Sequence, residues 1–130
     1  MYTLAGLHRI PRSLQNKKME EMIIYITIGY MSLVYLLIGL GINERNAEYL
    51  LAGYNTASED KKRNFNLNKY LKFFKLFFVR LSFFPLLSWL FVSLVINTDQ
   101  RQIVFWSLLQ LTPFVLFLRR SLGTNWNIEQ

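Results

Sequence analysis

The residues best suited to chemistry in this chain are two carboxylates, Glu44 and Glu48, which lie four positions apart. On a helix that spacing puts both on one face, and paired carboxylates can exchange protons or bind a metal. The single histidine, His8, lies far away in the sequence, and cysteine is absent. Because no nucleophile–base pair, phosphate-binding loop or metal-ligand spacing accompanies the glutamates, we expect a solvated face there. The sequence predicts no catalytic residue, cofactor or metal site, and a protein that is not an enzyme.

Arg80 and Gln110 are polar residues within otherwise apolar runs. A charge held in lipid hydrocarbon costs at least about 2.5 kcal/mol, so an intramembrane charge usually marks function. Arg80 lies near enough to the end of its run for its charge to reach the membrane surface, which we favour over a buried functional pairing. The amide of Gln110 lies deepest and needs a partner, so it should face the bundle, a neighbouring subunit or a cavity.

These polar residues must be positioned by three apolar runs, which span residues 22–40, 76–96 and 103–118. A hydrocarbon core of roughly 30 Å needs about 20 residues of helix to cross it. The first two runs are long enough, whereas the third crosses only if its flanks sit in the headgroups or the bilayer thins. The chain is also 52% hydrophobic and 18% charged, which leaves too little polar surface for an ordinary soluble domain. We therefore predict an all-α membrane protein with three transmembrane helices.

Two different connections join the three runs. The polar turn at residues 97–101 is short enough to join antiparallel neighbours, so the last two helices should form a hairpin, with kinks at Pro85 and Pro113. The longer connection should be a loop, residues 43–75, with short amphipathic juxtamembrane helices, and Asn66 or Asn68 should cap the helix that follows. The chain then divides into a basic N-terminal arm (1–21), a three-helix membrane domain (22–118) and a short C-terminal tail (119–130), whose Trp126 should be interfacial or frayed.

The start of the second membrane helix is amphipathic. At about 100° per residue, Lys69, Lys72, Lys75 and Arg80 fall within an arc of about 140°, opposite a run of aromatic residues. Such lysines reach lipid headgroups. The formal charge of +7 lies beside apolar runs and matches no nucleic-acid motif. The expected partners are therefore anionic membrane lipids and not nucleic acid.

Small residues share one face of the first membrane helix at Gly29, Ser32 and Gly39. Lipid gives no hydrophobic drive for helix association, so such a face favours close packing by van der Waals contact. The interpretation we favour is ordinary packing within a helix bundle. A membrane-protein partner or a second copy of the chain could use the same face.

A turn-rich segment, Ala52-Gly53-Tyr54-Asn55-Thr56, follows the first membrane helix. Gly53 and Asn55 tolerate positive φ, and Tyr54 has an apolar ring with a polar tip suited to the headgroup boundary. Thr56 with Glu59 matches a capping box, which predicts that Thr56 begins a short helix. We therefore expect a structured loop that acts as an interaction surface.

A membrane span, the A-G-Y-N-T segment with Ser58 and Glu59, a short charged helix and an apolar hairpin together resemble a family of small bacterial integral membrane proteins known as a domain of unknown function. The resemblance covers residues 22–118. It implies three membrane helices in the bacterial inner membrane and brings no catalytic residues. The Gly53-Tyr54-x-Thr56 pattern is also similar to the G-Y-x-T loop of bacterial immunity proteins against membrane-directed toxins, although Asn55 stands where that loop has arginine.

Basic residues predict the orientation, since cytoplasmic loops are enriched in Lys and Arg. With three spans, the long loop and the C-terminus share one side, and that side holds more of the basic residues. We predict a multi-pass inner-membrane (plasma-membrane) protein with its N-terminus outside and its C-terminus in the cytoplasm.

Two functions fit these features. The first is a non-enzymatic accessory, immunity or signalling subunit that acts by helix and loop contacts. The alternative is an oligomeric small transporter or channel whose polar path uses Arg80, Gln110, Ser82 and Ser93, because three helices alone enclose little room.

Overall fold

The computed structural model describes residues 10–128, without the side chains of Ala52 and Gly53. Within this range the chain is helical and has no β-strand beyond one isolated antiparallel bridge, between Phe65 and Asn127. The helices, in chain order, are α2 (Arg12–Gly41), α3 (Ala47–Leu50), α4 (Ala52–Asn55), α5 (Glu59–Asn64), α6 (Leu67–Leu81), α7 (Phe84–Val95), α8 (Asp99–Leu109) and α9 (Thr112–Gly123).

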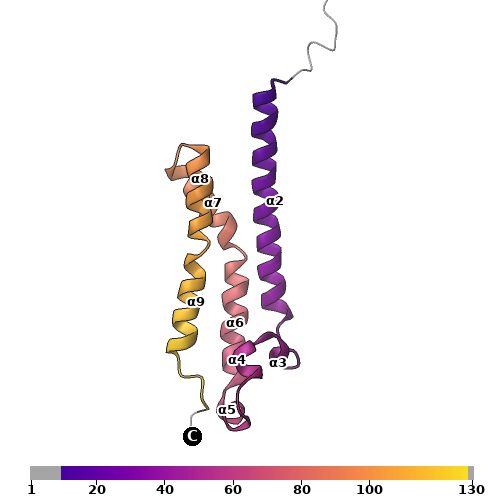
Figure 1. The fold of residues 1–130 in the computed structure, drawn as a ribbon, viewed down its shortest axis with the longest axis vertical. Helices are drawn as coiled ribbons and strands as arrows, with labels where there is room; N and C mark the ends of the chain where they lie inside the picture. The colour runs from indigo at the N-terminus through magenta and orange to yellow at the C-terminus, as the bar shows by residue number, and fades with distance from the viewer. Residues whose placement is uncertain (1–9, 129–130) are drawn as a thin grey trace, which may run out of the picture.

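Three long helical stretches are long and apolar enough to cross a membrane: Arg12–Gly41, Leu67–Val95 and Asp99–Gly123. Figure 1 shows them as three adjacent rods, with α3, α4 and α5 gathered at one end, which we call the loop end. The first rod is α2, the second is α6 followed by α7, and the third is α8 followed by α9. The predicted all-α membrane fold with a terminal helical hairpin is confirmed.

The first rod begins earlier than predicted. Helix α2 starts at Arg12, after Pro11 at the N-cap, so much of the expected basic arm is helix. Its first turns contain good helix formers such as Leu14, Lys17 and Glu20, and proline is compatible with a helix start. At 1.5 Å per residue the helix is about 45 Å long, so it extends well beyond the apolar run. His8 lies outside the described residues.

Both later rods are broken near a proline. Helix α6 ends at Leu81 and α7 begins at Phe84, with Pro85 in its first turn; α9 likewise begins just before Pro113. Proline has no N–H to donate to the preceding turn, so the helical hydrogen-bond ladder is interrupted there. The predicted kinks are therefore present. The third rod reaches from Asp99 to Gly123, which removes the predicted shortage of length because its polar flanks are helical too.

The first rod packs against the second along most of its length, and α7 packs against α8. Two buried clusters hold these contacts. The Trp89–Trp106 cluster also includes Ile28 and Val92. The loop-end cluster consists of Ile42, Ala47 and Leu71.

The three small residues predicted to form one packing face are not equivalent. Gly39 is buried, and a Cβ placed on it would lie 3.1 Å from the Cβ of Phe78 and 3.1 Å from the backbone nitrogen of Val79. Ser32 is half-buried. Gly29 is exposed, with open space where a Cβ would be. Within the described chain the common face is corrected: the packed side of α2 runs through Ile28 and Gly39, because aliphatic side chains fill the contact with α7.

Candidate functional site

The long loop folds back onto the end of the bundle. The side-chain oxygens of Asn43 and Asn46 accept backbone N–H bonds of 2.8–3.1 Å, and the Asn46 amide donates to the Gly41 carbonyl at 2.7 Å. These bonds satisfy polar groups exposed where α2 ends. They also place Ala47, which is fully buried, against Ile42 and Leu71. The loop is therefore fixed to the end of α2 by its asparagines.

The A-G-Y-N-T segment is mostly helical. Helix α4 covers Ala52–Asn55, and no described residue has a positive φ, so Gly53 and Asn55 do not use their tolerance of positive φ. The predicted helix start at Thr56 is corrected, since Ser58 is the N-cap residue of α5. Glu59 and Asp60 then lie in the first turn, where the helix dipole favours acids. The sequence pattern identified the short charged helix but placed its cap two residues early.

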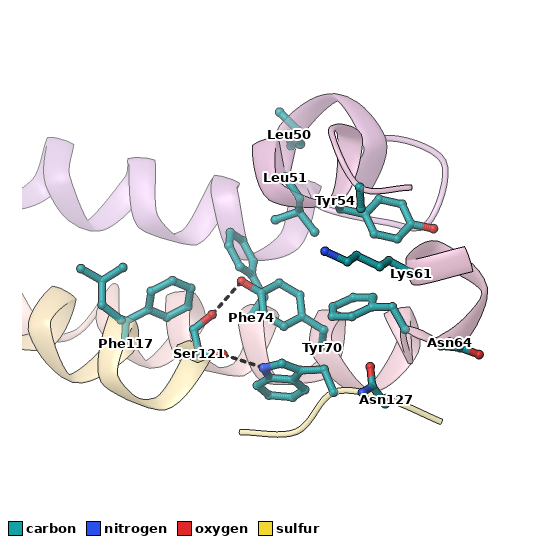
Figure 2. A pocket seen from close by; sticks show the side chains of 14 residues that line it. Leu50, Leu51, Tyr54, Lys61, Asn64, Tyr70, Phe74, Phe117, Ser121 and Asn127 are labelled. Carbon is teal, nitrogen blue, oxygen red and sulfur yellow. Dashed lines mark hydrogen bonds between the residues drawn. The ribbon is translucent and has the colours of Figure 1, made fainter. Parts of the chain in front are cut away.

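Tyr54 lines an open pocket of about 870 Å³ at the loop end, which we call the Tyr54 pocket. Figure 2 shows its walls converging from four parts of the chain. The loop contributes Leu50, Leu51, Tyr54, Ala57, Lys61, Asn64 and Phe65, helix α6 contributes Tyr70 and Phe74, helix α9 contributes Phe117, Leu118 and Ser121, and the tail contributes Trp126 and Asn127. The pocket is largely apolar and aromatic.

The C-terminal tail closes one side of this pocket. The N–H of Asn66 donates to the Trp126 carbonyl at 2.6 Å, and the N–H of Ile128 donates to the Asn64 carbonyl at 2.7 Å. The Trp126 indole N–H donates to the Ser121 carbonyl at 2.7 Å, and its ring meets Tyr70 edge-on at 5.0 Å between centroids. The frayed alternative is therefore corrected for the described residues: α9 continues to Gly123, and residues 124–128 return to the loop. The interfacial position of Trp126 stays a prediction.

Two neighbouring lysines of α5 have different surroundings. The Lys62 ammonium lies 4.0 Å from a carboxylate oxygen of Glu48, 3.9 Å from one of Glu59, and 5.7 Å from the centre of the Tyr54 ring. Its charge is thus compensated within the loop. Lys61 points into the Tyr54 pocket (Figure 2), and no acidic side chain is among the described residues that line the pocket. Lys61 therefore gives an apolar cavity one positive group.

The Asn66 amide oxygen accepts from the N–H of Lys69 at 3.0 Å and so caps α6. Lys69 and Lys72 are exposed and Lys75 is half-exposed, on the side of α6 away from the aromatic residues. Lys72 and Lys75 share a shallow hollow with Glu44, whereas Glu48 pairs with Lys62. The two glutamates therefore do not form one site.

The two intramembrane polar residues lie in opposite environments. Gln110 is 8% exposed, and its amide donates to the Ser88 hydroxyl oxygen at 2.9 Å, so it faces the bundle interior. Arg80 is exposed on the outer surface. The Ser82 and Ser93 hydroxyls donate to carbonyls of their own helices. These four residues do not line one path within the described part of a single chain.

Sequence reasoning missed most of the pocket. The sequence offered these residues separately: three aromatic residues in helices (Tyr70, Phe74 and Phe117), a tryptophan in a polar tail (Trp126) and one basic residue in a charged helix (Lys61). A local sequence spacing could not join them, because the wall is made by segments far apart in the chain, such as those that hold Tyr54 and Trp126. The tail offered one signal: a tryptophan flanked by asparagines after a basic helix end is unusual for an unstructured segment.

The family model of a domain of unknown function, DUF3784, matches residues 29–119. The chain belongs to the DUF3784 family. The match covers the loop, the α6–α7 rod and most of the last rod, so it includes most of the Tyr54 pocket but not its tail wall. No curated protein and no solved structure matches this DUF3784 chain. Within the described residues, no group of three histidine, cysteine or acidic side chains could hold a metal ion.

Proposed function

We propose that this DUF3784 protein is a non-enzymatic accessory subunit of the bacterial inner membrane that binds a membrane-protein partner at the Tyr54 pocket. The proposal includes a cytoplasmic loop end and an N-terminus outside, as the distribution of basic residues favours. One observation carries it: four chain segments converge on an open apolar pocket that spanning a membrane does not require. Ordering a loop and a tail costs conformational entropy, so a binding role explains their fixed arrangement better than a simple connection.

The chemistry of the walls suggests the kind of partner segment. Most of the binding energy of a protein interface comes from a few residues, often Trp and Tyr, that cluster in desolvated pockets. The Tyr54 pocket has this composition in Tyr54, Tyr70 and Trp126. Lys61 adds a positive group. A juxtamembrane segment with an apolar side chain followed by an acidic residue would match both.

Photo-cross-linking in intact cells tests this proposal. A photoreactive amino acid replaces Tyr54 in one variant and Tyr49 in a control variant, because Tyr49 belongs to the same loop but is 83% exposed and is not a lining residue of the pocket. We expect a discrete adduct with one membrane protein from position 54, much weaker from position 49.

A second change sharpens the test. Lys61→Gln in the chain with the photoreactive residue at position 54 should reduce the adduct several-fold, whereas Arg63→Gln, on the same helix, should not. Equal adducts from positions 49 and 54, or an adduct insensitive to Lys61→Gln, would contradict binding at the pocket.

A further inference from the structure

A second groove lies on the outer surface of the bundle, where α6 and α9 run side by side. A groove of about 400 Å³ lies between them, and two arginines, Arg80 and Arg120, line it together with Phe73, Leu76, Phe77 and Leu116. No acidic residue is among the described residues that line this Arg80–Arg120 groove. Two like charges thus share an apolar groove without a counter-charge from the described residues around it.

The helix directions bring the two guanidinium groups toward each other. In a helix each Cα–Cβ bond tilts toward the N-terminus. Helix α6 begins at the loop end, so the side chain of Arg80 leans toward that end. Helix α9 begins deeper in the bundle, so Arg120 leans inward. The two side chains therefore enter the same groove from opposite directions.

Aromatic contact holds the outer arginine in place. The Arg120 guanidinium carbon lies 5.9 Å from the centre of the Phe73 ring, which is a cation–π distance. Phe73 is itself stacked on Phe117 of α9, with 5.5 Å between centroids and 8° between planes. Arg80 lies seven residues beyond Phe73, about 10 Å further along α6. The groove therefore has one cation at its mouth and one deeper, separated by apolar wall.

We propose that the Arg80–Arg120 groove binds one anionic glycerophospholipid. Both exposed arginines belong to stretches that can span a membrane, so lipid is the molecule that surrounds them. A phosphate between the guanidiniums supplies the missing negative charge and accepts paired N–H bonds from either fork. The acyl chains then lie deeper in the groove, against Leu81, Phe84 and Pro113. This site differs from the lysine face at Lys69 and Lys72, which offers general attraction to headgroups, and it does not depend on the proposed partner.

Native mass spectrometry of the full chain in neutral detergent tests the site. Phosphatidylglycerol and phosphatidylcholine with identical acyl chains are titrated separately, and retained lipid is counted. We expect one tightly held phosphatidylglycerol and at least about tenfold weaker binding of phosphatidylcholine, because the second lipid is neutral overall. Glycerol phosphate without acyl chains should not displace the bound lipid. Equal retention of the two lipids, or displacement by glycerol phosphate, would overturn the proposal.

Variants locate the site. Arg80→Gln and Arg120→Gln should each weaken phosphatidylglycerol binding about tenfold, as expected for loss of a charge-assisted hydrogen bond, while Lys72→Gln on another face of α6 should leave binding within about twofold. Arg120→Lys keeps the charge but loses the planar fork, so its effect should be intermediate. Circular dichroism verifies folding. Should Arg80→Gln not fold, Arg120→Gln at an exposed helix end decides alone: unchanged lipid binding in that variant, or an equal loss in Lys72→Gln, contradicts the site.

Discussion

Two aromatic clusters in this protein are built in different ways. The Trp89–Trp106 cluster is buried: its rings meet edge-on at 5.9 Å, and the Trp106 indole N–H donates to the Pro85 carbonyl at 3.0 Å. The Tyr54 pocket gathers more rings but leaves about 870 Å³ open between them. One cluster fills its space and joins the rods, whereas the other keeps apolar surface accessible. The first cluster therefore contributes most of the stability, whereas the second has the open apolar surface that the proposed binding role requires.

The hydrogen bonds make the same distinction. Within the bundle, a side chain of one rod donates to a backbone carbonyl of another, as Trp106 does to Pro85 in the first turn of α7. Gln110 and Ser88 add a bond between rods at the same level. At the loop end, by contrast, backbone bonds tie the tail to the start of α6. The side-chain bonds within the bundle join the membrane-spanning rods, whereas the backbone bonds at the loop end hold the tail wall of the Tyr54 pocket.

Trp106→Ala should have the largest effect on stability. The substitution removes an indole that is 7% exposed and leaves a cavity beside Trp89. We therefore expect the free energy of unfolding to fall by about 3 kcal/mol or more. The measurement is reversible unfolding of the purified protein in mixed detergent. Trp106→Phe, which keeps most of the packing and loses the bond to Pro85, should cost much less. A loss from Trp106→Ala no greater than that from Trp126→Ala would break the comparison between the two clusters.

Gly39→Leu should come next. A Cβ at this position would already be 3.1 Å from Phe78 and Val79 atoms, so the larger side chain must push α2 away from α6 at a cost of about 1–3 kcal/mol. Gly29→Leu is the matched control because nothing lies near its Cβ position. It should be neutral or slightly stabilising, since leucine is the better helix former. Equal destabilisation by both substitutions would show that the small residues do share a packed face.

Trp126→Ala should have the smallest effect on the bundle. The substitution removes ring contacts with Tyr70 and Phe73 at the tail. The free energy of local opening at the tail should therefore fall by about 1 kcal/mol. Hydrogen exchange is the appropriate measurement: the amides of Asn66 and Ile128, which pair with the tail and the loop, should exchange about fivefold faster. The amide of Ile96, bonded within its own rod to Val92, should be unchanged. If the amide of Ile96 also exchanged faster, the Tyr54 pocket and the Trp89–Trp106 cluster would not be independent.

Features set by local sequence were predictable. Long apolar runs determine the three spans, prolines determine the breaks, and the Asn66 cap follows from an asparagine before an amphipathic run. The early start of α2 was missed because hydropathy marks the part of a helix in lipid and says nothing about helical turns beyond it. Thr56 matched a capping box in spacing, but Ser58 is the residue at the helix start.

Features set by contacts between distant segments were not predictable in the same way. Gly29 and Gly39 lie about 80° apart on a helical projection, and only Gly39 meets another helix. Which of the two does so depends on where α6 crosses α2. Tyr54 was singled out from its motif, but its neighbours Tyr70 and Trp126 come from the second rod and the tail. Arg80 was recognised as unusual, whereas its companion Arg120 is visible only once α9 lies beside α6.

The most direct test of the folded loop end is a disulfide between Phe65→Cys and Asn127→Cys in native membranes. These residues face each other across the isolated bridge and exchange no backbone bonds themselves, a pairing with Cα atoms about 4.5 Å apart that suits a disulfide. The chain has no cysteine of its own. The control pairs Phe65→Cys with Ile128→Cys, whose side chain points the other way. We predict rapid, nearly complete oxidation of the first pair and slow oxidation of the control. Equal or negligible oxidation in both would contradict a tail that closes the Tyr54 pocket.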